Sequence, residues 1–66
     1  MFNFNIIMRV HERDIPMPLD VNLGLLEACY RADLYATRNK DATFIVVNEY
    51  GDVEYETSKG ILYADA

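Results

Sequence analysis

The chain has 66 residues, with one cysteine and one histidine, and its net charge at neutral pH is −5. This length predicts a single domain over residues 1–66, and the lone Cys29 and His11 exclude an internal disulfide and a Cys/His zinc site, which needs four such ligands. A net negative chain is also poorly suited to bind nucleic-acid phosphates or anionic membranes, because both attract basic surfaces.

The negative charge is concentrated in the C-terminal part of the chain. Residues 1–40 hold five acidic and five basic side chains, whereas residues 41–66 hold six acidic side chains and one basic side chain. The N-terminal residues show no basic segment followed by an apolar core, and no apolar run approaches about 18 residues, so we expect neither a signal peptide nor a membrane span. Together with the single thiol, this pattern favours the reducing cytoplasm.

Residues 2–10 alternate between apolar and polar positions, which predicts a half-buried strand. One face would carry five apolar side chains: Phe2, Phe4, Ile6, Met8 and Val10. After a charged turn, Pro16 and Pro18 exclude a central strand from residues 11–20. A short edge strand and a covering loop both fit this segment.

A helix is expected to begin near Asp20 or Asn22, which are both favourable N-cap residues, and to end near Arg38. Asn39 would take the left-handed position that often follows a helix. At 100° per residue the helix has a polar strip and two apolar ridges. The smaller ridge consists of Leu25, Ala28, Cys29, Ala32 and Ala36, and the larger ridge consists of Leu23, Leu26, Tyr30 and Leu34.

One ridge can pack on a sheet, and the small one allows the closer approach. The larger ridge is then covered either by residues 13–19 or by a partner or second subunit. Leu23, Leu26, Tyr30 and Leu34 are therefore the candidate residues for self-association.

Residues 43–57 predict a β-hairpin. Residues 48–51 (Asn-Glu-Tyr-Gly) fit a type I turn that continues into a left-handed glycine. Pairing of Asn48 with Asp52 would then place Val47 opposite Val53, Val46 opposite Glu54, Ile45 opposite Tyr55 and Phe44 opposite Glu56.

In this register, one face of the hairpin is apolar and packs against the helix through Ile45, Val47, Val53 and Tyr55. The opposite face combines acidic and apolar side chains, because Asp52, Glu54 and Glu56 occupy every second position. With Tyr50 at the turn, that face is the candidate partner-binding surface, formed by Phe44, Val46, Tyr50, Asp52, Glu54 and Glu56. Residues 60–66 add Ile61, Leu62 and Tyr63, either as a short strand or as a docked terminal segment.

The order of elements is strand, short strand or loop, helix, strand, strand. This order predicts an α+β fold in which one helix packs on one face of a small antiparallel sheet of three or four strands.

The sequence gives little support for catalysis. Cys29 with His11 is the sole nucleophile–base combination, and nothing in the sequence brings the two together. Carboxylates in a strand row lie roughly 7 Å apart, too far to share one metal ion. We therefore expect no enzyme activity, no metal site and no cofactor.

We expect a small acidic protein that binds a larger macromolecule, namely a protein with a basic surface. In size and acidity the chain resembles the small β/α proteins that bacteriophages make to bind and block host enzymes, and that resemblance implies an inhibitor or modulator of a host protein. The alternative is a self-associating accessory subunit, a homodimer through the helix or through a sheet edge.

Overall fold

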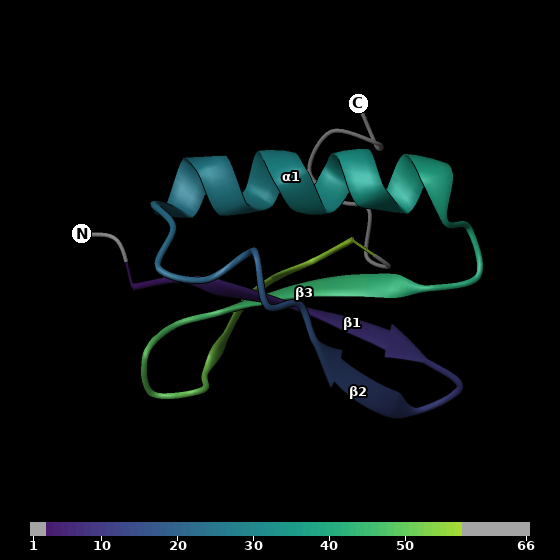
Figure 1. Ribbon diagram of the computed structural model, residues 1–66, viewed down its shortest axis with the longest axis horizontal. Helices are drawn as coiled ribbons and strands as arrows, with labels where there is room; N and C mark the ends of the chain where they lie inside the picture. The colour runs from purple at the N-terminus through teal and green to yellow at the C-terminus, as the bar shows by residue number, and fades with distance from the viewer. Residues whose placement is uncertain (1–2, 58–66) are drawn as a thin grey trace.

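The computed structural model describes residues 3–57, and in this part of the chain one helix packs on one face of a four-stranded antiparallel sheet (Figure 1). The predicted α+β fold is confirmed. Phe2 and residues 60–66, for which the sequence suggested a strand position and a terminal strand or docked segment, lie outside the described residues. The elements are β1 (Asn5–Val10), β2 (Arg13–Pro16), α1 (Leu25–Arg38), β3 (Thr43–Val47) and β4 (Val53–Glu56).

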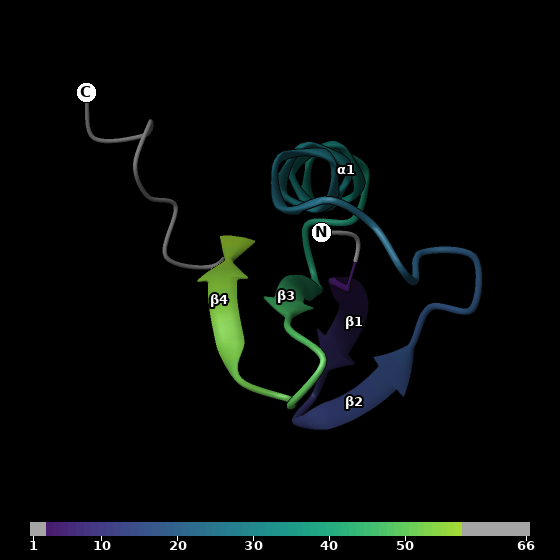
Figure 2. The ribbon, with the colours of Figure 1, turned by 90° about the vertical axis from the view of Figure 1, so that its left-hand side faces the viewer.

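The strands lie in the order β2-β1-β3-β4, so the N-terminal strand and the strand after the helix form the centre of the sheet. Viewed along the helix axis, α1 lies over β1 and β3, while β2 and β4 flank this central pair and twist strongly away from it (Figure 2). The two edges of the sheet therefore belong to the two shortest strands.

The β1–β2 hairpin resolves the alternative that the sequence left open for residues 11–20. Arg13–Pro16 form an edge strand, with Val10 opposite Arg13 and only His11 and Glu12 between them. Both turn residues are left-handed, with φ of 51° and 65°. This is the geometry of a type I′ turn, whose backbone twist matches that of the flanking strands.

The helix begins later than predicted. Gly24 is the N-cap residue and makes no side-chain cap hydrogen bond. Asp20 is buried instead, and Asn22 has a left-handed φ of 57° and donates its N–H to Asn5 Oδ1 at 3.0 Å. These tertiary contacts outweigh the capping preference of the two residues.

The helix ends at Arg38, as predicted, but Asn39 is not left-handed. Its φ is −130°, and both its backbone N–H and its side-chain Nδ2 donate to the Tyr35 carbonyl at 2.9 Å. The side-chain amide thus supplies a hydrogen-bond donor to a carbonyl in the last turn of the helix, and no left-handed residue is needed there.

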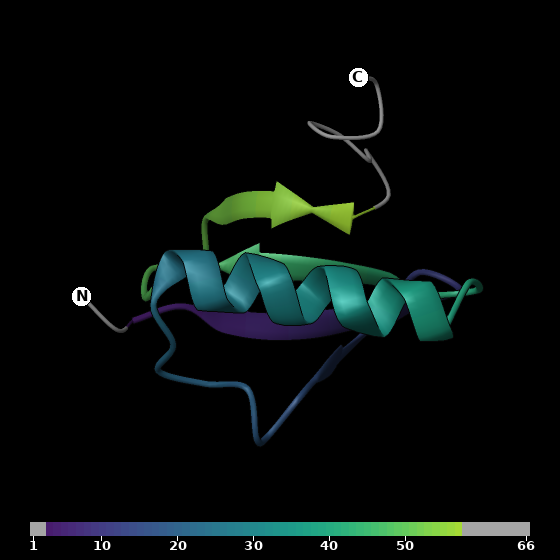
Figure 3. The ribbon, with the colours of Figure 1, turned by 90° about the horizontal axis from the view of Figure 1, so that it is seen from above.

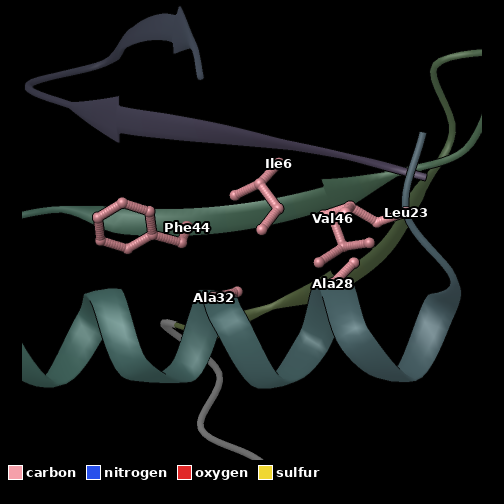
Figure 4. Close-up of a cluster of buried hydrophobic side chains, with 6 residues drawn as sticks. All are labelled: Ile6, Leu23, Ala28, Ala32, Phe44 and Val46. Carbon is pink, nitrogen blue, oxygen red and sulfur yellow. The ribbon is translucent and has the colours of Figure 1, made fainter. Parts of the chain in front are cut away.

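The core lies between α1 and the two central strands. Ala28 and Ala32 present the small face of the helix to Ile6 on β1 and to Phe44 and Val46 on β3 (Figure 4). The small ridge packs on the sheet as expected through Ala28, Ala32, Cys29 and Ala36, whereas Leu25, which was predicted to belong to it, is exposed. Leu23 closes one end of this core through a two-hydrogen-bond bridge to Phe4.

The register of the β3–β4 hairpin differs from the prediction. Val47 does lie opposite Val53, but Val46 lies opposite Tyr55 and Ile45 opposite Glu56, so Glu54 is an extra residue in a β-bulge. The face of β3 is reversed as well, because Phe44 and Val46 face the helix while Ile45 and Val47 lie on the other side of the sheet. Pairing with β1 explains this, since Met8 lies opposite Phe44 and Ile6 opposite Val46.

Candidate functional site

The turn between β3 and β4 is held rigid by the side chain of Asn48. Its Oδ1 accepts the backbone N–H groups of Tyr50 and Asp52, both at 2.9 Å. The backbone of Asn48 adds two hydrogen bonds, accepting the Gly51 N–H at 3.0 Å and donating to the Asp52 carbonyl at 2.9 Å. The predicted turn is confirmed, including the left-handed Gly51 with φ of 86°.

This turn presents an aromatic side chain to solvent. Tyr50 is 80 % exposed, and Val53, the first residue of β4, is also exposed. Three exposed carboxylates surround them, and one of these, Glu54, accepts a hydrogen bond of 3.3 Å from Asn48 Nδ2. We call this region the hairpin tip, and it consists of Asn48, Glu49, Tyr50, Gly51, Asp52, Val53 and Glu54.

The predicted binding face is only partly brought together. Tyr50, Asp52 and Glu54 share the hairpin tip, but Phe44 and Val46 are fully buried against α1 and cannot contact a partner. The β-bulge at Glu54 breaks the predicted row of carboxylates. Glu56 lies beside Ile45 on the sheet face away from the helix, where its charge acts on Arg9.

The larger apolar ridge of α1 remains exposed on the outer side of the helix. Leu26 is 85 % exposed, Tyr30 65 % and Leu34 39 %. Leu23 does not belong to this surface, because it precedes the helix and is buried in the core. Residues 13–19 run along the β2 side of the molecule (Figure 3) and leave Leu26 and Tyr30 exposed, so the covering loop considered for them does not form.

A buried carboxylate fastens the loop before the helix, a role that the sequence did not predict. Asp20 Oδ1 accepts from Arg31 Nη1 at 2.9 Å, and both carboxylate oxygens lie 3.0 Å from the Tyr35 hydroxyl. The backbone carbonyl of Asp20 accepts the Ile6 N–H at 3.0 Å. The spacing of Arg31 and Tyr35, one helical turn apart, was the available signal, but Asp20 lies too far from them in sequence for a local pattern.

An apolar groove of about 400 Å³ lies between β2, the loop after it and α1. Its single carboxylate, Asp20, is already engaged by Arg31 and Tyr35, so the groove offers no pair of carboxylates for acid–base chemistry. The lining residues are Met8, Ile15, Pro16, Met17, Pro18, Leu19, Asp20 and Tyr35.

Cys29 and His11 lie on different elements, on α1 and in the β1–β2 turn. Burial, helped by the negative charges of Asp33 and Glu54, raises the pKa of the Cys29 thiol. A nucleophilic cysteine needs the opposite shift, because the thiolate is the reactive form. Within residues 3–57 no group of three His, Cys, Asp or Glu side chains is placed to hold a metal ion.

The described part of the chain has no helix with the length and apolar character needed to cross a membrane. No known protein family, curated protein or solved structure matches this sequence or fold. The function must therefore be inferred from the chemistry of the surfaces described above.

Proposed function

We propose that this chain is a non-enzymatic protein that acts by binding another protein through the hairpin tip. The observation that carries the proposal is Tyr50, an aromatic side chain that is 80 % exposed on a turn already fixed by Asn48. Tyrosine is enriched in protein interfaces, and a rigid turn loses little conformational entropy when it binds. The structure of the turn therefore favours contact over a purely structural role for Tyr50.

The charge of the hairpin tip supports a partner with a basic surface. The tip carries Glu49, Asp52 and Glu54, and no basic residue occurs between positions 41 and 58. The bases of the described chain lie elsewhere: Arg31 is bound to Asp20 and Glu27, and the others lie at the opposite end, near the β1–β2 turn, in the last turn of α1 and just after it (Figure 1). Such an acidic end accelerates encounter with a basic surface and orients the two proteins.

A basic groove of a nucleic-acid enzyme is one surface of this kind. A protein that occupies it competes with phosphates, which would make this chain an inhibitor or modulator of the type that bacteriophages direct against host proteins. The proposed location is the cytoplasm, where the single thiol of Cys29 stays reduced.

The proposal is tested by affinity capture from an extract of the producing cells, followed by a direct binding measurement with the purified captured protein. We expect Tyr50→Ala to weaken binding at least about tenfold, as loss of a tyrosine hot spot does. Glu49→Lys/Asp52→Lys should also weaken binding, and binding of the wild type should fall as salt rises.

The matched control is Glu12→Lys/Asp41→Lys, which changes the net charge equally but at exposed acids outside the hairpin tip. It should bind as the wild type does, apart from a general charge effect. A captured protein that binds Tyr50→Ala and Glu49→Lys/Asp52→Lys as tightly as the wild type would contradict the proposal.

A further inference from the structure

No element within residues 3–57 lies over the outer face of α1 (Figure 3), and this face carries a stripe of exposed apolar side chains. Leu26, Tyr30 and Leu34 are spaced four residues apart, so they lie next to one another along one side of the helix. At a rise of 1.5 Å per residue the stripe is about 12 Å long. Ala28 and Ala32 are on the opposite side, against the sheet, so core packing does not explain the apolar character of the stripe.

We propose that the partner of this stripe is a second copy of the same chain, packed with its α1 antiparallel. With the two-fold axis level with Ala32, Tyr30 of each copy lies opposite Leu34 of the other. Leu26 then lies opposite the aliphatic part of Arg38 of the second copy. The three stripe residues of each copy are thus covered by the other copy, and each contact occurs twice, once on either side of the axis, as a two-fold interface requires.

The charges beside the stripe are complementary in this arrangement. Glu27 and Arg38 lie on the same side of the stripe, about 100° and 120° around the helix from Leu26. Antiparallel pairing about the axis at Ala32 brings Glu27 of one copy next to Arg38 of the other, at both ends of the interface. Arg38 forms no ion pair with any residue from 3 to 57, whereas Glu27 contacts Arg31 through Oε2 alone.

The opposite orientation is disfavoured by charge. A parallel pair would align two helix macrodipoles and would bring both acidic hairpin tips to the same end of the dimer. The antiparallel pair places the acidic end of each copy beside the end of the other that holds Arg38 and Lys40. A membrane surface is a poor alternative occupant, because the stripe is flanked by the acids Glu27 and Asp33 as well as by bases.

The exposed surface is small, which sets the expected strength. Three exposed side chains and their charged neighbours can bury less than about 1,200 Å² in total, a size typical of weak complexes. We therefore expect a dimer that dissociates in the micromolar range.

The experiment is sedimentation equilibrium of the full chain from about 1 to about 100 µM, with circular dichroism of the same samples. The wild type should shift from monomer to dimer, and Tyr30→Glu should stay monomeric while it keeps its helical signal. Leu19→Glu, at an 88 % exposed leucine outside α1, is the matched control and should dimerise as the wild type does. A wild type that is monomeric throughout, or a dimer that survives Tyr30→Glu, would overturn the proposal.

The orientation is tested by disulfide cross-linking in a Cys29→Ser background. When chains with Leu26→Cys and chains with Arg38→Cys are mixed and oxidised, the antiparallel pair should give the mixed 26–38 disulfide. Cross-linking of position 26 to position 26 alone would show a parallel pair and overturn the antiparallel arrangement. The charge reversal Arg38→Glu should weaken the dimer, and Glu27→Arg/Arg38→Glu should restore part of the loss.

Discussion

Asp20 shows how a single buried side chain joins three parts of this small fold. It is 2 % exposed, and its carboxylate and backbone contact α1 and β1 at once. Its carboxylate accepts hydrogen bonds from the Arg31 guanidinium and the Tyr35 hydroxyl. Such partners offset the free-energy cost of burying a carboxylate in the protein interior. Asp20 therefore holds the loop between β2 and α1 to both elements, together with the backbone hydrogen bonds between Leu23 and Phe4.

Replacing this carboxylate should destabilise the protein markedly. Asp20→Ala leaves the Tyr35 hydroxyl and part of the Arg31 guanidinium without their acceptor, which should cost about 2 kcal/mol. The free energy of unfolding from urea titration measures the effect. Asp14→Ala, which removes an exposed partner of Arg9, should change stability little. Equal effects of the two substitutions would refute the role assigned to Asp20.

Tyr35 should make stability depend on alkaline pH. Burial, and next the hydrogen bond to Asp20, raise the pKa of its hydroxyl. The folded state thus holds this proton more tightly than the unfolded state, so its contribution is constant below the ordinary tyrosine pKa of about 10 and falls as the pH rises above it. In denaturation series from neutral to alkaline pH, Tyr35→Phe should lose less stability with rising pH than the wild type. Parallel curves would contradict this account.

The β1–β2 turn holds two residues in a conformation that favours glycine and asparagine. His11 and Glu12 have φ of 51° and 65°. This left-handed conformation costs roughly 1 kcal/mol for each residue that is neither glycine nor asparagine. Glu12→Gly should relieve this strain and, despite its greater freedom in the unfolded state, raise the free energy of unfolding by up to about 1 kcal/mol. Glu12→Ala is the control, since alanine keeps the strain; a gain equal to that of glycine would show that loss of the charge is responsible.

At the scale of elements, the strands and the helix could be predicted because their patterns are local. The alternation of residues 2–10, the Asn-Glu-Tyr-Gly turn and the long helix each have a clear period or turn chemistry. The side of β3 that meets the helix could not be read from its own sequence, because residues 44–47 are all apolar and all buried. That side is set by pairing with β1, because the alternating apolar residues of β1 determine which of its faces packs against the helix.

The same limit explains the errors at the candidate site. The sequence pattern reverses the side of β3, so it places Phe44 and Val46 on a surface although both belong to the core. The bulge at Glu54 inserts one residue into β4, and this displaces Glu56 from the predicted row. The turn itself was predicted correctly because Asn48 and Gly51 specify it directly. The buried position of Asp20 depended on contacts distant in sequence.

The close contact between α1 and the sheet requires small side chains at the helix face. Ala28 and Ala32 are fully buried there. Ala32→Leu should force the helix away from Phe44 and Val46 and lower the free energy of unfolding by about 1–3 kcal/mol. Thr37→Leu, at an exposed position of the same helix, should change it by less than about 0.5 kcal/mol. Chemical denaturation of both variants compares them, and an unchanged Ala32→Leu stability would show that the interface is not closely packed.

For the molecule as a whole, the main property is an acidic end that carries no base. The hairpin tip lies at one end of the sheet with three carboxylates and no base, whereas Arg38 and Lys40 lie at the other end, where Asp41 follows them (Figure 1). The helix adds to this polarity with Glu27 in its first turn and Arg38 in its last. This distribution suits a protein that meets a basic partner with one end and leaves the outer face of α1 for a second contact.

The most direct test of the central claim is site-specific photo-cross-linking in the producing cells, with a photoreactive phenylalanine analogue at position 50. We expect irradiation to link position 50 to one protein with a basic surface. The same analogue at position 19, an exposed residue outside the hairpin tip, should not give that product. No adduct from position 50, or the same adduct from both positions, would contradict the claim that this protein acts through its hairpin tip.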